Sequence, residues 1–231
     1  MIYLITIRHG ESYKNLKNIS GGLGEGLTEI GINQVKDSAT QLNSFLQTKK
    51  GYTVLGFRSC DRQQLVETCD IIESITGVSF NKDERYVPIK LGVFNGMSSE
   101  KQRELYPKAA QEMQEWNDGT RDIMDVHVEG MQDSGEHVNK IIDFLKSIPD
   151  NSIVILVGTR SDISAVKNIQ KGNHPWIKNT FRFIPTEYAE ISCTRYNINK
   201  DSMIFNNNNQ SNINYENGDL EWILKNNQKL L

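Results

Sequence analysis

Short apolar segments alternate along the chain with segments in which hydrophobic residues recur every three or four positions. Residues 2–8, 53–58 and 152–157 are apolar and rich in β-branched side chains, which predicts buried parallel strands. Hydrophobic positions at helical spacing predict amphipathic helices over 32–46 and 138–145. This order of elements predicts an α/β fold, a three-layer α/β/α sandwich with a mostly parallel central sheet.

The last part of the chain has a different pattern. Residues 187–198 alternate in polarity and predict another strand, with 203–205 and 222–224 as segments that would pair with it. The asparagine-rich run 206–212 predicts a polar turn or flexible loop.

Composition limits the class of protein. A chain of 231 residues that is 37% hydrophobic and 24% charged fits one domain over 1–231. A net charge of −3 without a basic block argues against nucleic-acid binding.

No apolar run approaches the roughly 20 residues that span a bilayer, and the N-terminal strand leaves no room for a signal peptide, so we expect a cytoplasmic protein. Three cysteines without metal spacing predict neither a metal site nor a disulfide framework, and no cofactor is expected.

The first apolar segment ends in Arg8-His9-Gly10-Glu11. Open α/β sheets carry their chemistry at the C-terminal ends of strands, so a cation and an imidazole are expected there. Gly10 allows a tight turn in which an anion can approach backbone amides, and Arg8 can bind that anion in a bidentate fork. Taken alone, a charged turn after a strand is also typical of an ordinary solvated loop.

This opening, followed by Asn15 and by Thr28-x-x-Gly31-x-x-Gln34, resembles the histidine phosphatase superfamily, also called phosphoglycerate mutase-like. The resemblance implies phosphoryl transfer to a histidine, two arginines and a second histidine around the phosphoryl oxygens, and a carboxylic acid that protonates the leaving group. His9 then corresponds to the nucleophile, Arg8 to the first arginine and Asn15 to a polar contact of the phosphoryl group.

Three positions depart from the family pattern. Gln64 stands where the family has its second arginine, Thr159 where it has its second histidine, and Pro88 where it has its acid. Gln64 and Thr159 can still donate neutral hydrogen bonds to phosphate, which are weaker than charged ones by roughly half. Proline can neither donate nor accept a proton, so the site is expected to have lost positive charge and its acid.

Arg62, Glu84 and Arg160 are the candidates to compensate for these losses. Arg62 lies two residues before Gln64, which is about 200° around a helix, so it faces away unless the helix begins later. Glu84 lies upstream of the acid position and would have to reach in from another part of that segment. Arg160 replaces a family glycine at the tight turn, where it either adds charge or blocks the pocket mouth.

Two functions remain open. The first is a histidine-phosphatase-fold protein that binds a phosphorylated small molecule or another anion, with ordinary phosphatase activity lost or strongly weakened. Losing a general acid costs about 10²–10⁴ in rate, and losing one charge-stabilising donor costs about 10²–10³. The alternative is an active phosphomonoesterase or phosphotransfer enzyme that works through a phosphohistidine at His9.

The resemblance also implies a helical cap insertion at about 92–131, which shapes substrate choice in this family. Leu105, Met113 and Trp116 are its candidate packing residues, and Pro107 is expected to interrupt its helix. A homodimer formed through an edge strand near the C-terminus is a further expectation at the level of the family.

Overall fold

The computed structural model describes residues 1–173 and 175–196. Five strands form one sheet in the order β3-β2-β4-β1-β5, in which β5 runs antiparallel to β1 and the other neighbours are parallel. The strands are β1 (Ile2–Arg8), β2 (Thr53–Arg58), β3 (Phe80–Asn81), β4 (Ser152–Gly158) and β5 (Ile191–Tyr196). The helices are α1 (Tyr13–Leu16), α2 (Glu29–Thr48), α3 (Gln63–Thr76), α4 (Ser99–Leu105), α5 (Pro107–Asn117), α6 (Ser134–Lys146) and α7 (Arg160–Gln170), with short 3₁₀ turns at Gly92–Phe94 and Ile123–Asp125.

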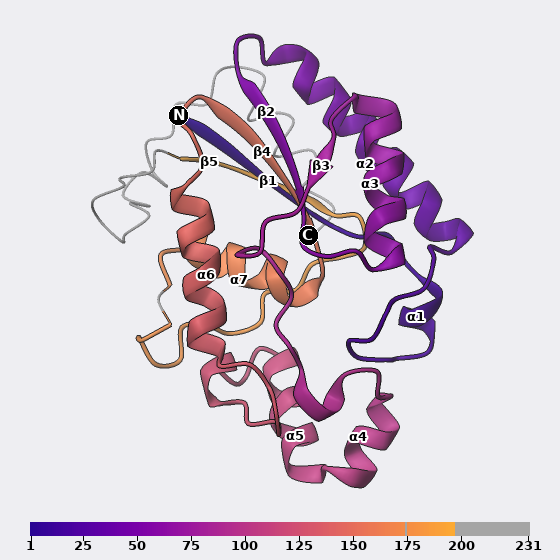
Figure 1. Ribbon diagram of the computed structural model, residues 1–231, viewed down its shortest axis with the longest axis vertical. Coiled ribbons are helices and arrows are strands. Elements are labelled where there is room, and N and C mark those ends of the chain that lie inside the picture. Colours follow the sequence, from indigo (N-terminus) through magenta and orange to yellow (C-terminus); the bar gives the residue numbers. More distant parts are fainter. Residues whose placement is uncertain (174, 197–231) are drawn as a thin grey trace.

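Both faces of the sheet are covered, because successive side chains of a strand point to opposite faces. Ile2 and Leu4 of β1 belong to a buried cluster that includes residues of α6 and α7. Tyr3 and Ile5 belong to a second cluster with α2 and α3. Figure 1 shows these helix pairs on either side of the sheet. The predicted three-layer α/β/α sandwich is confirmed.

The predicted elements are close to the observed ones. Strands β1 and β2 have the predicted bounds, and β4 extends one residue further. Helices α2 and α6 are longer than predicted because capping residues set their starts: the side chains of Thr28 and Asp133 accept hydrogen bonds from the backbone of Gly31 and Glu136. None of the helices in the described ranges is both long and apolar enough to cross a membrane.

The predicted strand 187–198 begins later than expected. Strand β5 begins at Ile191, where antiparallel pairing with Ile7 of β1 starts. Its predicted end and the segments 203–205, 206–212 and 222–224 lie outside the described residues.

Residues 92–131 contain α4 and α5, which lie beyond the sheet in Figure 1, together with both 3₁₀ turns. We call this segment the helical insert. Met113 and Trp116 are buried, as expected of packing residues. The expectation for Leu105 was wrong, because its side chain is exposed. Leu105 ends α4, and Pro107 begins a new helix, so the three residues do not share one helix face.

Candidate active site

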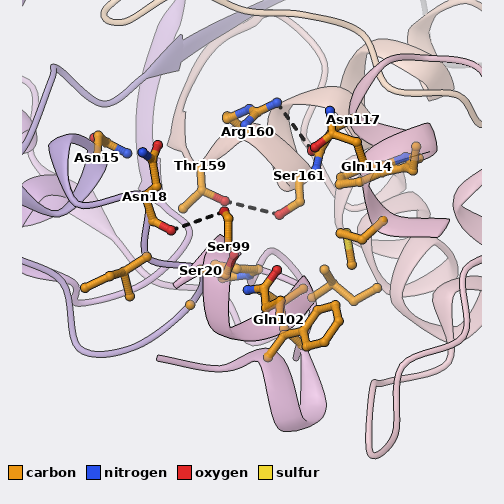
Figure 2. A pocket seen from close by; sticks show the side chains of 18 of the residues that line it. Asn15, Asn18, Ser20, Ser99, Gln102, Gln114, Asn117, Thr159, Arg160 and Ser161 are labelled. Carbon is orange, nitrogen blue, oxygen red and sulfur yellow. Dashed lines mark hydrogen bonds between the residues drawn. The ribbon is translucent and has the colours of Figure 1, made fainter. Parts of the chain in front are cut away.

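The C-terminal ends of β1, β2 and β4 meet at one edge of the sheet. The register pairs Arg8 with Gly158 and Arg58 with Val157, so the residues that follow these strands are neighbours. The backbone amide of His9 donates to the carbonyl of Gly158 at 3.1 Å. A cavity of about 850 Å³ opens at this edge and is also lined by residues of the helical insert. Its polar side chains come from both parts of the molecule (Figure 2).

The cavity brings together most of the residues that the sequence singled out. Glu84 is the exception: it is exposed, does not line the cavity, and therefore gives the site no acid. Those that line the cavity are Arg8, His9, Asn15, Arg62, Gln64, Pro88, Thr159 and Arg160.

His9 is buried and fixed in orientation. Its Nδ1 lies 2.7 Å from the carbonyl oxygen of Gly10, which cannot donate, so Nδ1 carries the proton and Nε2 keeps its lone pair. Burial, together with the charges of Arg8, Lys14 and Arg62, lowers the pKa of His9 to about 3, against the opposing effect of the Gly10 hydrogen bond. The imidazole is therefore neutral at neutral pH, the state that a nucleophile requires.

Arg8 is held by residues of the segment that precedes β5. Its Nη1 donates to the carbonyl of Thr186 at 2.6 Å, and its guanidinium carbon lies 3.8 Å from the centre of the Tyr188 ring. Such stacking leaves the edge of the guanidinium plane available to an anion. Its Nε has no hydrogen-bond partner within the described part of the chain. Thr186 and Tyr188 were not expected from the sequence, because no local pattern links them to Arg8.

The motif Thr28-x-x-Gly31-x-x-Gln34 fixes the loop after the histidine. The backbone amide and the hydroxyl of Thr28 both donate to Glu11, at 3.0 and 2.8 Å. The amide of Glu11 donates to the side-chain oxygen of Gln34 at 3.0 Å. A Cβ added to Gly31 would lie 2.0 Å from the carbonyl oxygen of Glu11, so only glycine allows this approach. The start of α2 thus clamps the residue two positions after His9.

Arg62 faces the cavity because α3 begins later than the sequence pattern suggested. Arg62 is the N-cap residue, with extended backbone angles, and the helix starts at Gln63. Its Nε donates to the carbonyl of Gly22 at 3.1 Å. The 200° separation from Gln64 therefore does not apply. Gln64 also lines the cavity, and its Oε1 is buried without a hydrogen-bond partner in the described ranges.

Thr159 is less available to phosphate than the sequence suggested. It is the N-cap residue of α7, and its hydroxyl donates to the buried carboxylate of Asp162. The amide of Thr159 also donates to Asp162, at 2.9 Å. The expectation of a free hydroxyl donor at this position was therefore wrong, because Asp162 accepts that proton within the helix cap.

Arg160 lines the cavity. Its guanidinium carbon lies 4.6 Å from the centre of the Phe183 ring, and its Nη2 donates to Asn117 of the helical insert at 3.4 Å. Figure 2 shows this contact at the border between the body and the insert.

Asn15 and Lys14 lie together on α1. The side-chain oxygen of Asn15 accepts hydrogen bonds from the backbone and the hydroxyl of Ser12, which leaves its amide nitrogen available to the cavity. Lys14 also lines the cavity, with 6% of its surface exposed. Lys14 was not expected from the sequence, since a lysine in a short polar segment is usually solvated.

The cavity is strongly positive. The cations that line it are Arg8, Lys14, Arg62, Arg103 and Arg160. Glu115 is the sole carboxylic acid among the described lining residues, and Arg121 lies 2.7 Å from it. That ion pair lowers the pKa of Glu115, so it stays ionised. Buried Lys14 and partly buried Arg62 thus supply positive charge beyond that of Arg8, while a family-type acid is missing among these described residues.

The site therefore combines a neutral, oriented imidazole with a guanidinium at the C-terminal end of a strand in an α/β fold. This chain belongs to the histidine phosphatase superfamily: the family model for branch 1 of that superfamily matches residues 4–203. No curated protein matches the chain.

Solved structures share the fold at low sequence identity. The mycobacterial glucosyl-3-phosphoglycerate phosphatase superposes with a TM-score of 0.63 at 18% identity, over 83% of this chain and 91% of that one. YhfR of Bacillus stearothermophilus superposes with a TM-score of 0.65 at 18% identity, over 85% of this chain and 92% of that one. A third structure, a putative alpha-ribazole-5'-P phosphatase from Escherichia coli, has a TM-score of 0.64 at 16% identity, over 87% and 93%.

Proposed function

We propose that this protein hydrolyses phosphate monoesters of small molecules through a phosphohistidine at His9. One observation carries the proposal: Nδ1 of His9 is bound to the Gly10 carbonyl, which leaves an unprotonated Nε2 for the cavity. Arg8 would hold the phosphoryl oxygens while Nε2 attacks phosphorus in line, and water would then release phosphate. Membership of the superfamily supports the same reaction class.

The reaction is expected to be slow with unactivated esters. The second histidine of the family is replaced by Thr159, whose hydroxyl proton is bound by Asp162. Each missing donor costs about 10²–10³ in rate, although such losses do not simply multiply. Aryl phosphates, whose leaving groups need little protonation, should react fastest.

The test compares phosphate release by the wild type with that by His9→Ala. The substrates are 4-nitrophenyl phosphate and a panel of phosphorylated metabolites at high enzyme concentration. We expect His9→Ala to lower release by about 10²-fold or more, because no other group would take up the phosphoryl group. His127→Ala is the matched control, since the His127 side chain is 77% exposed and does not line the cavity. Equal release by the wild type and His9→Ala would overturn the proposal.

A second candidate function is anion binding without turnover. It is favoured by the engaged hydroxyl of Thr159 and by the ion pair that holds the only acid among the described lining residues. Inorganic phosphate would then raise the thermal midpoint of the wild type while no release depends on His9. Release that depends on His9 would exclude this candidate.

A further inference from the structure

Lys14 is a buried cation without an ion-pair partner among the described residues. Its Nζ makes no hydrogen bond or ion pair with any residue in the ranges 1–173 and 175–196, although the side chain lines the cavity. Lys17, three residues later, lies 2.8 Å from Glu25 and is mostly exposed. Burying an unpaired ammonium costs free energy of folding. Such a cost at the edge of a cavity is typical of a site that meets an anion.

The charges around Lys14 come from several elements. Arg62 at the start of α3 repels the ammonium, and His9 after β1 is affected by it in turn. Cys60 after β2 and Glu25 in the loop before α2 act in the opposite direction. Glu25 is already bound by Lys17, and no carboxylate lies within hydrogen-bond distance of Lys14 in the described part of the molecule.

The proposed reaction needs a proton for the leaving oxygen, and the cavity offers few donors. Pro88 has none, Glu115 is ionised, and a guanidinium does not release its proton in proteins. Besides Lys14, the phenol of Tyr188 lines the cavity, but its ring is stacked on the Arg8 guanidinium. Burial, and then repulsion by Arg62, lower the pKa of Lys14 to about 8. Its ammonium is therefore mostly protonated at neutral pH and still able to give up a proton, as a general acid must be.

We propose that the ammonium of Lys14 protonates the leaving oxygen when the phosphoryl group passes to His9, so that Lys14 replaces the carboxylic acid of the family. This inference rests on the proposed function. The P–O bond to the leaving group breaks as the bond from phosphorus to Nε2 forms, and one proton moves from Nζ to the departing oxygen. The neutral amine then takes a proton from the water that attacks the phosphohistidine, which restores the ammonium.

The experiment compares substrates with different needs for protonation. The leaving group of 4-nitrophenyl phosphate is a phenolate that is stable as an anion. The leaving group of glycerol 2-phosphate is an alkoxide, which needs a proton. Lys14→Met should lower kcat for glycerol 2-phosphate by about 10²–10⁴-fold, the usual contribution of a general acid, and kcat for 4-nitrophenyl phosphate by less than about 10-fold. Lys17→Met is the control and should change neither.

Lys14→Arg separates proton donation from charge. Arginine keeps the positive charge but holds its proton, so it should show the same split between the substrates as Lys14→Met. With glycerol 2-phosphate, activity of the wild type should fall as the pH rises through about 8, the pKa to which burial lowers Lys14. This alkaline decline should be absent from both variants. Added methylammonium should restore part of the alkyl phosphate activity of Lys14→Ala.

Equal losses for both substrates, or full activity of Lys14→Arg, would overturn the proposal and leave Lys14 as a phosphate-binding cation. That result is distinguishable from failure of the proposed function, in which release would not depend on His9 with either substrate. A fold defect is also distinguishable, because removing the buried charge in Lys14→Met should leave the thermal midpoint unchanged or raise it.

Discussion

At the scale of single residues, His9 and His137 show two outcomes for a buried imidazole. His9 has a carbonyl partner and faces the cavity. His137 on α6 is buried and neither ring nitrogen has a hydrogen-bond partner in the described ranges. Its burial lowers its pKa to about 4, against an opposing effect of Asp162. It lies outside the main cavity and does not replace the missing second histidine.

We predict that His137→Leu stabilises the fold by about 1–2 kcal/mol, because two unpaired polar atoms are removed from the interior. Because the pKa of His137 is depressed to about 4 in the folded state, the unfolded state binds its proton more readily, and the free energy of unfolding of the wild type should fall as the pH drops from about 6.5 toward about 4. Urea unfolding at pH 7 and pH 5 should show a smaller difference in the variant. A destabilised variant at pH 7 would contradict the prediction.

The sequence revealed Arg8, His9 and Asn15, because the family motif places them within one short segment. It could not reveal Lys14, because the neighbouring groups Cys60 and Arg62 come from a segment more than 40 residues further along the chain. The prediction for Arg62 depended on where α3 begins. Because the helix starts at Gln63, Arg62 is its N-cap residue and lines the cavity. Helix boundaries are the least certain part of any pattern-based prediction.

At the scale of elements, the start of α2 clamps the loop after β1 and so fixes the position of Glu11, two residues after His9. Strands and helices were predictable because their periodicity is local. Contacts between the elements were not predictable. The motif residues Thr28, Gly31 and Gln34 were recognised by resemblance, and only the structure shows that all three contact Glu11.

We predict that Gly31→Ala destabilises the protein by about 1–3 kcal/mol or more, since the added methyl group would overlap the Glu11 carbonyl. Phosphate release should fall as well, because the loop beside His9 must move. Gly135→Ala is the control: this α6 residue has only the Asp133 side chain near its added Cβ, at 3.2 Å. Thermal unfolding and release from 4-nitrophenyl phosphate would measure both effects, and equal behaviour of the two variants would refute the clamp.

At the scale of the whole molecule, the helical insert packs against and hydrogen-bonds to the segment between α7 and β5. The ring of Trp116 packs edge-on against Phe183 with centres 5.2 Å apart. The amide of Phe181 donates to Asp122 at 3.0 Å, and the amide of Ile123 donates to the Phe181 carbonyl at 3.1 Å. Insert and body should therefore unfold together.

We predict that Trp116→Ala lowers the free energy of unfolding by about 3–5 kcal/mol in a single transition, because a large buried side chain joins the two parts. Trp176→Ala, at a tryptophan that is 55% exposed, should change it by less than about 0.5 kcal/mol. Two separate transitions in calorimetry would show that the insert is an independent unit.

The position of β1 in the sheet determines when the candidate site can form during folding. Its two neighbours, β4 and β5, come from residues 152–158 and 191–196, and the carbonyl that binds Arg8 belongs to Thr186. Contacts of such sequence separation form late, since long loops must close first. A partly folded chain would hold Arg8 and His9 but no working pocket. Under the proposed function, phosphate release that depends on His9 should therefore return during refolding only after β4 and β5 have paired with β1.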